Sequence, residues 1–242
     1  EESTEDDEFR INFSYQDNTR FEYWKRMEFS KHQWKELHEH ALEKNLVFLS
    51  SPFSKKALDM LIEIDVPAIK IASGEAINFN FLNLIAKSKI PVLLSTGMSY
   101  DNEIRRAIKL FKDKNIPIAC MQCTSKYPLD YKDVGLNVMV DIMKNENILV
   151  GYSDHSGSLF PPMNAISKGA NLIEVHITFD KRMFGPDTSS SITIEELKQL
   201  VDYRDAVFQM DKSIINKDQI AKELFSTRQL FTKSLSPIED IE

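Results

Sequence analysis

The sequence predicts an α/β fold built from repeated strand–helix units, specifically most of a (β/α)8 TIM barrel. Short β-branched apolar runs recur along the chain, and amphipathic segments with a 3.6-residue period lie between them. Each run is apolar on both faces and is followed by polar residues, which is typical of strands in a covered parallel sheet. The six predicted strands are 47–51, 68–72, 92–96, 116–120, 148–151 and 172–177.

Amphipathic helices are predicted between these strands and before the first of them. Ser30 with Gln33, and Thr193 with Glu196, have the spacing of a capping box, in which two side chains satisfy the first amides of a helix. Another apolar stripe lies within 101–114. The side chains expected on the buried faces of the three helices are Trp34, Leu37, Ala41 and Leu42; Ile104, Ala107, Ile108 and Phe111; and Leu197, Leu200, Val201, Val207 and Phe208.

Periodicity alone leaves two architectures open, an open doubly wound sheet and a closed eight-stranded barrel. A barrel needs two strands more than the six runs, so we expect a partial barrel whose first strands are missing. The domain boundaries that we expect are an acidic polar segment over 1–20, the barrel over 21–215 and a C-terminal extension over 216–242.

Composition excludes several classes of function. The net charge is −7, but six of the acids lie in the first eight residues, and the rest of the chain is nearly neutral. Such a chain has no positive field for nucleic acid. No apolar stretch approaches the ~18 residues that span a bilayer. Cys120 and Cys123 are three residues apart, so on one strand they would point to opposite faces and would not pair with each other; we therefore expect a reducing, cytoplasmic location. The seven glycines form no nucleotide-binding fingerprint.

Polar residues gather where the predicted strands end, the edge at which such folds place their chemistry. Lys70 lies between Ile69 and Ile71, a position that is costly unless its ammonium meets an anion. Hydroxyl groups at neighbouring strand ends favour a phosphate as that anion. A carboxylate partner, Glu75 or Glu174, is the alternative. The hydroxyls belong to Ser51, Ser73, Ser95, Ser125 and Ser153.

Two histidines, His155 and His176, end adjacent predicted strands. Neighbouring strands lie ~4.8 Å apart, so two imidazoles on one face could share Mn²⁺, Zn²⁺ or Fe²⁺. The alternative is one hydrogen-bonded core histidine and one surface histidine. The segment 151–155 is one glycine short of a nucleophile elbow, which disfavours a hydrolase. The run 38–40 is expected on a solvated helix face.

The strand ends, in this order, resemble the N-acetylneuraminate (sialic acid) synthase family, which includes legionaminate and pseudaminate synthases. The resemblance covers about 28–210, and it rests on the stretches FLSSPFS, VPAIKIASGE, PVLLSTGMS, QCTSKYP, VGYSDHS, IEVHITFDK and GPD. It implies a (β/α)8 barrel that condenses phosphoenolpyruvate with an N-acetylated hexosamine such as N-acetylmannosamine. The product would be a nine-carbon 2-keto acid, with phosphate released.

The resemblance also implies roles for single residues. Phosphoenolpyruvate would be held by Lys70, Ser73, Ser95 and Ser153, with Ser51 and Ser125 where the family often has threonine and asparagine. The sugar would contact Glu75, Tyr127 and Asp187, and a divalent metal, manganese with Mg²⁺ or Co²⁺ as alternatives, would bind His155 and His176. Lys70, Glu75 and Glu174 are the expected catalytic residues. Glu174 is included because its position is in phase with that of His176 along the predicted strand, where it would orient a ligand or handle a proton. The family also implies a homodimer.

The sequence departs from the family in three places. We find neither the E-I-G-x-N-H motif of the first family strand nor the K-F-Q lysine of the second, and Thr188 follows the Gly-Pro-Asp turn where histidine is common. Residues 225–230 resemble the approach to an antifreeze-like domain. Two alternatives therefore stay open: a non-catalytic remnant acting as a binding module, and another phosphoenolpyruvate-dependent aldol-type synthase with a sugar phosphate acceptor.

Overall fold

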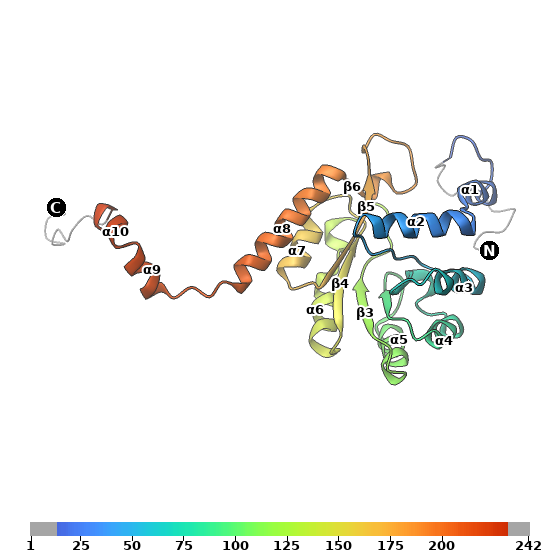
Figure 1. Ribbon diagram of the computed structural model, residues 1–242, viewed down its shortest axis with the longest axis horizontal. Helices are drawn as coiled ribbons and strands as arrows, with labels where there is room; N and C mark the ends of the chain where they lie inside the picture. The colour runs from blue at the N-terminus through green and yellow to red at the C-terminus, as the bar shows by residue number, and fades with distance from the viewer. Residues whose placement is uncertain (1–13, 232–242) are drawn as a thin grey trace. The chain divides into compact units, whose positions relative to one another are not determined.

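Six parallel strands form one curled sheet in the computed structural model, which describes residues 14–231 (Figure 1). The strands lie side by side in the order of the sequence, β1-β2-β3-β4-β5-β6. A doubly wound sheet would reverse its strand order at one point, so this order excludes that alternative for the described residues. The result is a half-barrel, and closure by eight strands is not shown. The strands are Ile69–Ile71, Val92–Ser95, Ile118–Gln122, Leu149–Asp154, Leu172–Thr178 and Ser191–Thr193.

Alternation along the strands separates a helix-covered face from a polar face. Ile69 and Ile71 of β1 are buried, whereas Lys70 between them points to the opposite face. In the same way Ser153 of β4 points to the face opposite that of its neighbour Tyr152, and it lies level with Glu174 of β5 in the strand register. The face that carries Lys70 therefore also carries polar side chains from β4 and β5.

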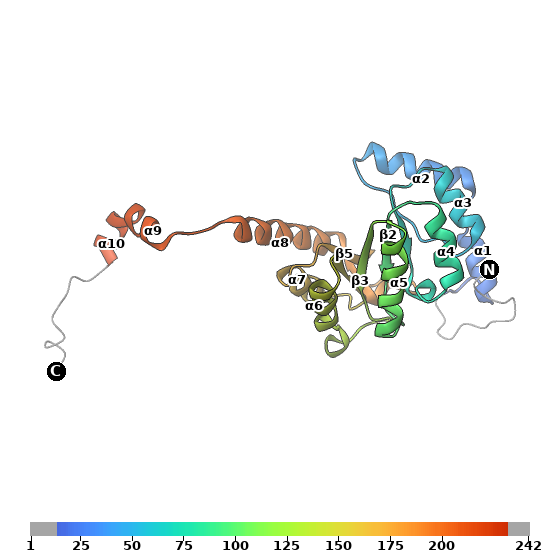
Figure 2. The same ribbon diagram turned by 90° about the horizontal axis from the view of Figure 1, so that it is seen from below.

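Helices connect the strands and cover one face of the sheet (Figure 2). Parallel strands in sequential order with right-handed crossovers place all of these helices on the same side. The covering helices are α3 (Lys55–Glu63), α4 (Phe79–Lys87), α5 (Asp101–Asp113), α6 (Leu136–Asn145) and α7 (Phe160–Ser167). Short 3-10 turns, η1 (Ser73–Glu75), η2 (Tyr131–Asp133) and η3 (Thr188–Ser190), lie in the loops.

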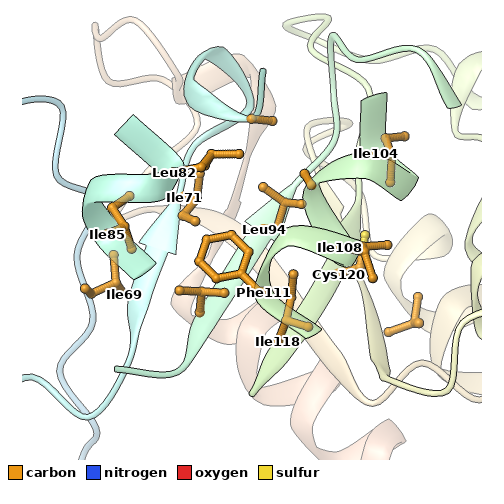
Figure 3. Packing of buried hydrophobic residues seen from close by; sticks show 14 of the residues in the cluster. Ile69, Ile71, Leu82, Ile85, Leu94, Ile104, Ile108, Phe111, Ile118 and Cys120 are labelled. Atoms are coloured by element: carbon orange, nitrogen blue, oxygen red, sulfur yellow. The ribbon is translucent and has the colours of Figure 1, made fainter. Parts of the chain in front are cut away.

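The core lies between these helices and the sheet. Phe111 of α5 is fully buried and packs among Ile71, Leu94 and Ile118 of the first three strands (Figure 3). Burying one such side chain contributes roughly 1.5–3 kcal/mol. All four apolar residues predicted for the stripe of this helix are buried, so that prediction is confirmed.

Two of the predicted strands differ from the observed sheet. The run 47–51 makes only a single parallel bridge, from Ser50 to Ile69, and Val47 is 70% exposed. β-branched residues alone therefore did not make a strand here. The strand that was not predicted is β6, because its residues Ser-Ile-Thr lack a run of apolar side chains. The strand predicted at 116–120 lies two residues later, over Ile118–Gln122.

Both predicted capping boxes are present, but the burial predicted for their helices is largely wrong. Ser30 caps α2 (Lys31–Glu43) together with Gln33, yet no residue of α2 is buried and Leu42 is 55% exposed. Thr193 and Glu196 bond reciprocally at the start of α8 (Ile194–Lys212), in which only Leu200 is buried. A stripe predicts a helix and its apolar face, but it does not predict what that face packs against.

The chain divides into two compact units, the first ending at Asp202 and the second beginning at Tyr203, inside α8. The first unit also contains α1 (Arg20–Met27), and the second contains α9 (Lys217–Glu223) and α10 (Phe225–Phe231). The acidic residues 1–8 of the predicted 1–20 segment lie outside the described residues, as do 232–242 of the predicted extension. Both cysteines are buried and unpaired with each other. None of the described helices combines the length and apolarity that crossing a membrane requires.

Candidate active site

Lys70 joins a chain of polar contacts on the polar face of the sheet. Its Nζ donates to Ser95 Oγ at 2.7 Å and lies 3.2 Å from Glu174 Oε2. The other oxygen of Glu174 accepts a 3.0 Å hydrogen bond from Ser153 Oγ. Only 13% of the Lys70 side chain is exposed, so its charge is balanced by the carboxylate predicted as the alternative partner. Four strands, β1, β2, β4 and β5, thus bring four predicted residues together.

A second group surrounds Gly97, just after β2. The Gly97 amide donates to Ser73 Oγ at 3.1 Å, and Ser73 Oγ lies 3.2 Å from Cys123 Sγ. An added Cβ on Gly97 would lie 2.3 Å from Ser125 Oγ and 2.9 Å from both Ser73 Oγ and Cys123 Sγ. Glycine is therefore required by this close approach of three side chains. Ser73 and Ser125, both predicted ligands of phosphoenolpyruvate, meet here.

His155 is buried, and each of its two ring nitrogens makes a hydrogen bond. Nδ1 lies 2.8 Å from the Thr124 carbonyl oxygen, which can only accept, so Nδ1 carries the proton. Nε2 then presents its lone pair and accepts a 3.1 Å hydrogen bond from the Tyr127 hydroxyl. Burial lowers the pKa of His155 below its usual value, more than the Thr124 carbonyl raises it, which favours the neutral imidazole.

Tyr127 and His176 complete this third group. The Tyr127 ring stacks on His155, with centroids 4.2 Å apart, and the two imidazole centroids are separated by 5.3 Å. His176 Nδ1 lies 3.8 Å from Asp187 Oδ2. Burial of the hydroxyl end raises the pKa of Tyr127 to about 12, with Cys123, Asp187 and Glu174 adding to the effect, although the residue is 47% exposed as a whole. The phenol is therefore neutral at physiological pH.

Two predicted site residues stand apart from these contacts. Glu75 accepts a 2.8 Å hydrogen bond from Asn78 Nδ2 in an exposed position, and Ser51 is half-buried next to the bridge at Ser50. For the described part of the chain, no three or more His, Cys, Asp or Glu side chains are grouped so as to hold a metal. The predicted pair, His155 and His176, is adjacent, and the tautomer of His155 leaves one nitrogen able to ligate. The chain thus presents two imidazoles that fit a divalent metal.

Three participants in these contacts were not predicted: Gly97, Cys123 and the carbonyl group of Thr124. Gly97 lies in the stretch PVLLSTGMS, and the other two lie in QCTSKYP. Other residues of those two stretches were predicted to belong to the site. The close packing around Gly97 was not predicted, because it brings together residues from three separate loops. A backbone carbonyl acting on His155 leaves no trace in the sequence, because every residue has one.

The chain is similar to known proteins of one family. The model of the NeuB family matches residues 1–216. Pseudaminic acid synthase of Campylobacter jejuni is 34% identical over 213 residues, which cover 87% of this chain and 61% of that protein. N,N'-diacetyllegionaminic acid synthase of Legionella pneumophila is 36% identical over 199 residues, which cover 80% of this chain and 56% of that protein. This chain thus spans less than two thirds of the length of these curated relatives.

A solved structure agrees with these relatives. The crystal structure of N-acetylneuraminic acid (sialic acid) synthetase from Leptospira borgpetersenii, in complex with citrate, superposes with a TM-score of 0.77 at 31% sequence identity. The match covers 86% of this chain and 74% of that structure. The resemblance drawn from the strand ends is confirmed, and the chain belongs to the NeuB family.

Proposed function

We propose that this chain forms the phosphoenolpyruvate and metal half of a synthase site that condenses phosphoenolpyruvate with an N-acetylated hexosamine and releases phosphate. One observation supports this proposal most strongly. Lys70, its serine and carboxylate neighbours, and the two imidazoles gather at one end of one parallel sheet. That end is the carboxyl edge, where folds of this kind bind their ligands.

Lys70 is the proposed phosphate ligand. An ammonium has three protons, and here one meets Ser95 and another faces Glu174, so a third is available for an incoming anion. Ser73 contributes a hydroxyl whose oxygen accepts from the Gly97 amide, and its proton can turn from Cys123 Sγ, 3.2 Å away, to the phosphate. The remaining proposed contacts are Ser95 and Ser153, which already bond to Lys70 and Glu174, Ser125 beside Gly97, and Ser51 on the neighbouring bridge segment. Together they neutralise the phosphate and hold it in register as it leaves.

Glu174 is the proposed proton-handling group. It is bonded to both Lys70 and Ser153, so it links the ammonium to the hydroxyl of the neighbouring strand. A phosphate that shares Lys70 with Glu174 brings two anions together, and the carboxylate can then relieve the repulsion by taking a proton. Water that adds to the enol carbon supplies such a proton. Glu174 is therefore the group that we propose accepts this proton.

His155 and His176 are the proposed metal ligands, with Mn²⁺ as the preferred ion and Mg²⁺ or Co²⁺ as alternatives. A bound divalent ion would polarise the aldehyde of the acceptor, making its carbon electrophilic. The chain's own part is to hold His155 neutral, by burial, and in the ligating tautomer, by the Thr124 carbonyl group. Tyr127, Asp187 and Glu75 are the proposed sugar contacts.

The acceptor itself is proposed only as a class, N-acetylated hexosamines. The names of the relatives point to different nine-carbon acids, pseudaminic, legionaminic and sialic. The residues that contact the sugar in this proposal, Tyr127, Asp187 and Glu75, lie on three different loops. Differences among acceptors are therefore expected from loop residues and not from the Lys70 group.

Calorimetric titration of phosphoenolpyruvate into the chain tests the phosphate site. Lys70→Met should weaken binding about 10- to 100-fold, because one charge-assisted contact is lost. Lys109→Met is the matched control, since Lys109 pairs with Asp113 on the surface of α5 and should leave binding unchanged. Equal binding by wild type and Lys70→Met would overturn the proposed site. Phosphate release with phosphoenolpyruvate, N-acetylmannosamine and Mn²⁺, compared with arabinose 5-phosphate as acceptor, then tests the reaction class.

A further inference from the structure

The nitrogen of His155 that could bind a metal is already in contact with Tyr127. Because Nδ1 donates to the Thr124 carbonyl at 2.8 Å, Nε2 is the nitrogen with the lone pair. The Tyr127 hydroxyl lies 3.1 Å from that nitrogen, within hydrogen-bond distance. A lone pair that accepts this hydrogen bond is not available to a metal at the same time.

The rest of the Tyr127 side chain fixes the hydroxyl in this place. Its ring stacks on His155 with an interplanar angle of 26°, and it meets His176 edge-on at 5.8 Å. The Tyr127 ring therefore contacts both imidazoles. The residue is 47% exposed and belongs to the loop after β3, so its side chain has solvent into which it can turn.

We propose that the Tyr127 hydroxyl caps Nε2 of His155 and must leave this nitrogen before a divalent cation can bind there. The inference rests on the proposed metal site and adds a competition to it. Displacement breaks the hydrogen bond to His155 and frees the same hydroxyl for the acceptor sugar. Metal binding would thus precede productive sugar contact at Tyr127.

The alternative arrangement is Tyr127 as a further metal ligand. A phenol ligates well as the phenolate, whereas the hydroxyl that donates to Nε2 of His155 is the protonated form. The two arrangements predict opposite effects of removing the hydroxyl. If the hydroxyl is a cap, removing it should strengthen metal binding. If the hydroxyl is a metal ligand, removing it should weaken metal binding.

The experiment is a calorimetric titration of Mn²⁺ into the chain and into Tyr127→Phe. Phenylalanine keeps the stacked ring and removes only the hydroxyl, so the variant should bind Mn²⁺ about 3- to 10-fold more tightly, the worth of one hydrogen bond. Tyr131→Phe is the matched control. Its hydroxyl donates to Ser158 Oγ at 3.0 Å, away from the imidazoles, and its removal should leave Mn²⁺ affinity unchanged.

A second measurement uses the wild-type chain and does not depend on the folding of Tyr127→Phe. Zn²⁺ should produce a tyrosine difference absorption as the Tyr127 hydroxyl loses its acceptor, and His155→Ala should abolish that signal. Unchanged or weaker Mn²⁺ binding by Tyr127→Phe, or Zn²⁺ binding without the tyrosine signal, would overturn the cap while leaving the metal site intact. Mn²⁺ binding that is absent, or insensitive to His155→Ala, would overturn the metal site and the cap together.

Discussion

Replacing Gly97 by alanine perturbs the site at the point where its polar side chains are closest. The new methyl carbon would lie 2.3 Å from Ser125 Oγ and 2.9 Å from Cys123 Sγ and Ser73 Oγ, whereas ordinary contact begins at 3.4 Å. Ser125 Oγ must therefore move by more than an ångström, and the other two atoms must also give way. Overpacking of this kind costs about 1–3 kcal/mol of unfolding free energy. We expect Gly97→Ala to lose that much stability.

The same substitution should also weaken phosphoenolpyruvate binding. Ser73 is pushed away from the Gly97 amide that holds it at 3.1 Å, so its hydroxyl loses its orientation. Urea unfolding measures the stability loss, and calorimetric titration measures binding. Gly74→Ala is the matched control, since its Cβ would meet only Met98 Cε, at 3.8 Å. If Gly97→Ala has the same unfolding free energy and the same phosphoenolpyruvate affinity as Gly74→Ala, then close packing at Gly97 does not position Ser73.

Four other changes have expected outcomes. Phe111→Ala should lower the unfolding free energy by about 3–5 kcal/mol in urea, because the ring is fully buried in the core. His176→Ala should reduce Mn²⁺ binding at least tenfold by calorimetry while leaving the thermal midpoint nearly unchanged, since the residue is only half-buried. Glu174→Gln should lower the rate of phosphate release more than it lowers phosphoenolpyruvate affinity, because the amide keeps hydrogen bonds but cannot take a proton. At pH 10.5 the phenol of Tyr127 should remain protonated, given a pKa of about 12, so Tyr127→Phe should remove almost no phenolate absorbance.

Each of these predictions can fail. A stable Phe111→Ala would mean that the core does not depend on α5, and full Mn²⁺ affinity in His176→Ala would remove that imidazole from the metal site. Equal losses of rate and affinity in Glu174→Gln would indicate a binding residue without proton transfer. A large phenolate signal from Tyr127 at pH 10.5 would show that its hydroxyl end is not desolvated, because the pKa is raised only where burial disfavours the anion.

The fold was predictable wherever a local pattern was strong. The stripe of α5 and both capping boxes appear as predicted, because each depends on residues three or four positions apart. The strand predicted over 47–51 did not form, because a strand needs a neighbouring strand to pair with along its length. In this segment only Ser50 pairs, through a single bridge to Ile69. The apolar residues of α2 are not buried, because burial depends on which other elements pack against the helix, and the periodicity of its sequence does not predict those elements.

The site was predictable in its residues but not in its contacts. Lys70 and the strand-end serines followed from the cost of a charge in a strand and from the family's strand ends. The pairing of Lys70 with Glu174 stayed open between carboxylates, because it depends on which strands are neighbours and in what register. The hydrogen bond between the Tyr127 hydroxyl and His155 could not be predicted, because it depends on the path of the loop after β3 and no local sequence pattern predicts that path.

Lys70 and its neighbours are the proposed binding site for the phosphate of phosphoenolpyruvate. A crystal structure of the chain grown with phosphoenolpyruvate tests whether the phosphate binds there. We expect the phosphate within hydrogen-bond distance of Lys70 Nζ and of the Ser73 and Ser95 hydroxyls, with the enol carbons directed toward His155 and His176. A phosphate bound elsewhere, with the Lys70 contacts to Ser95 and Glu174 undisturbed, would contradict it.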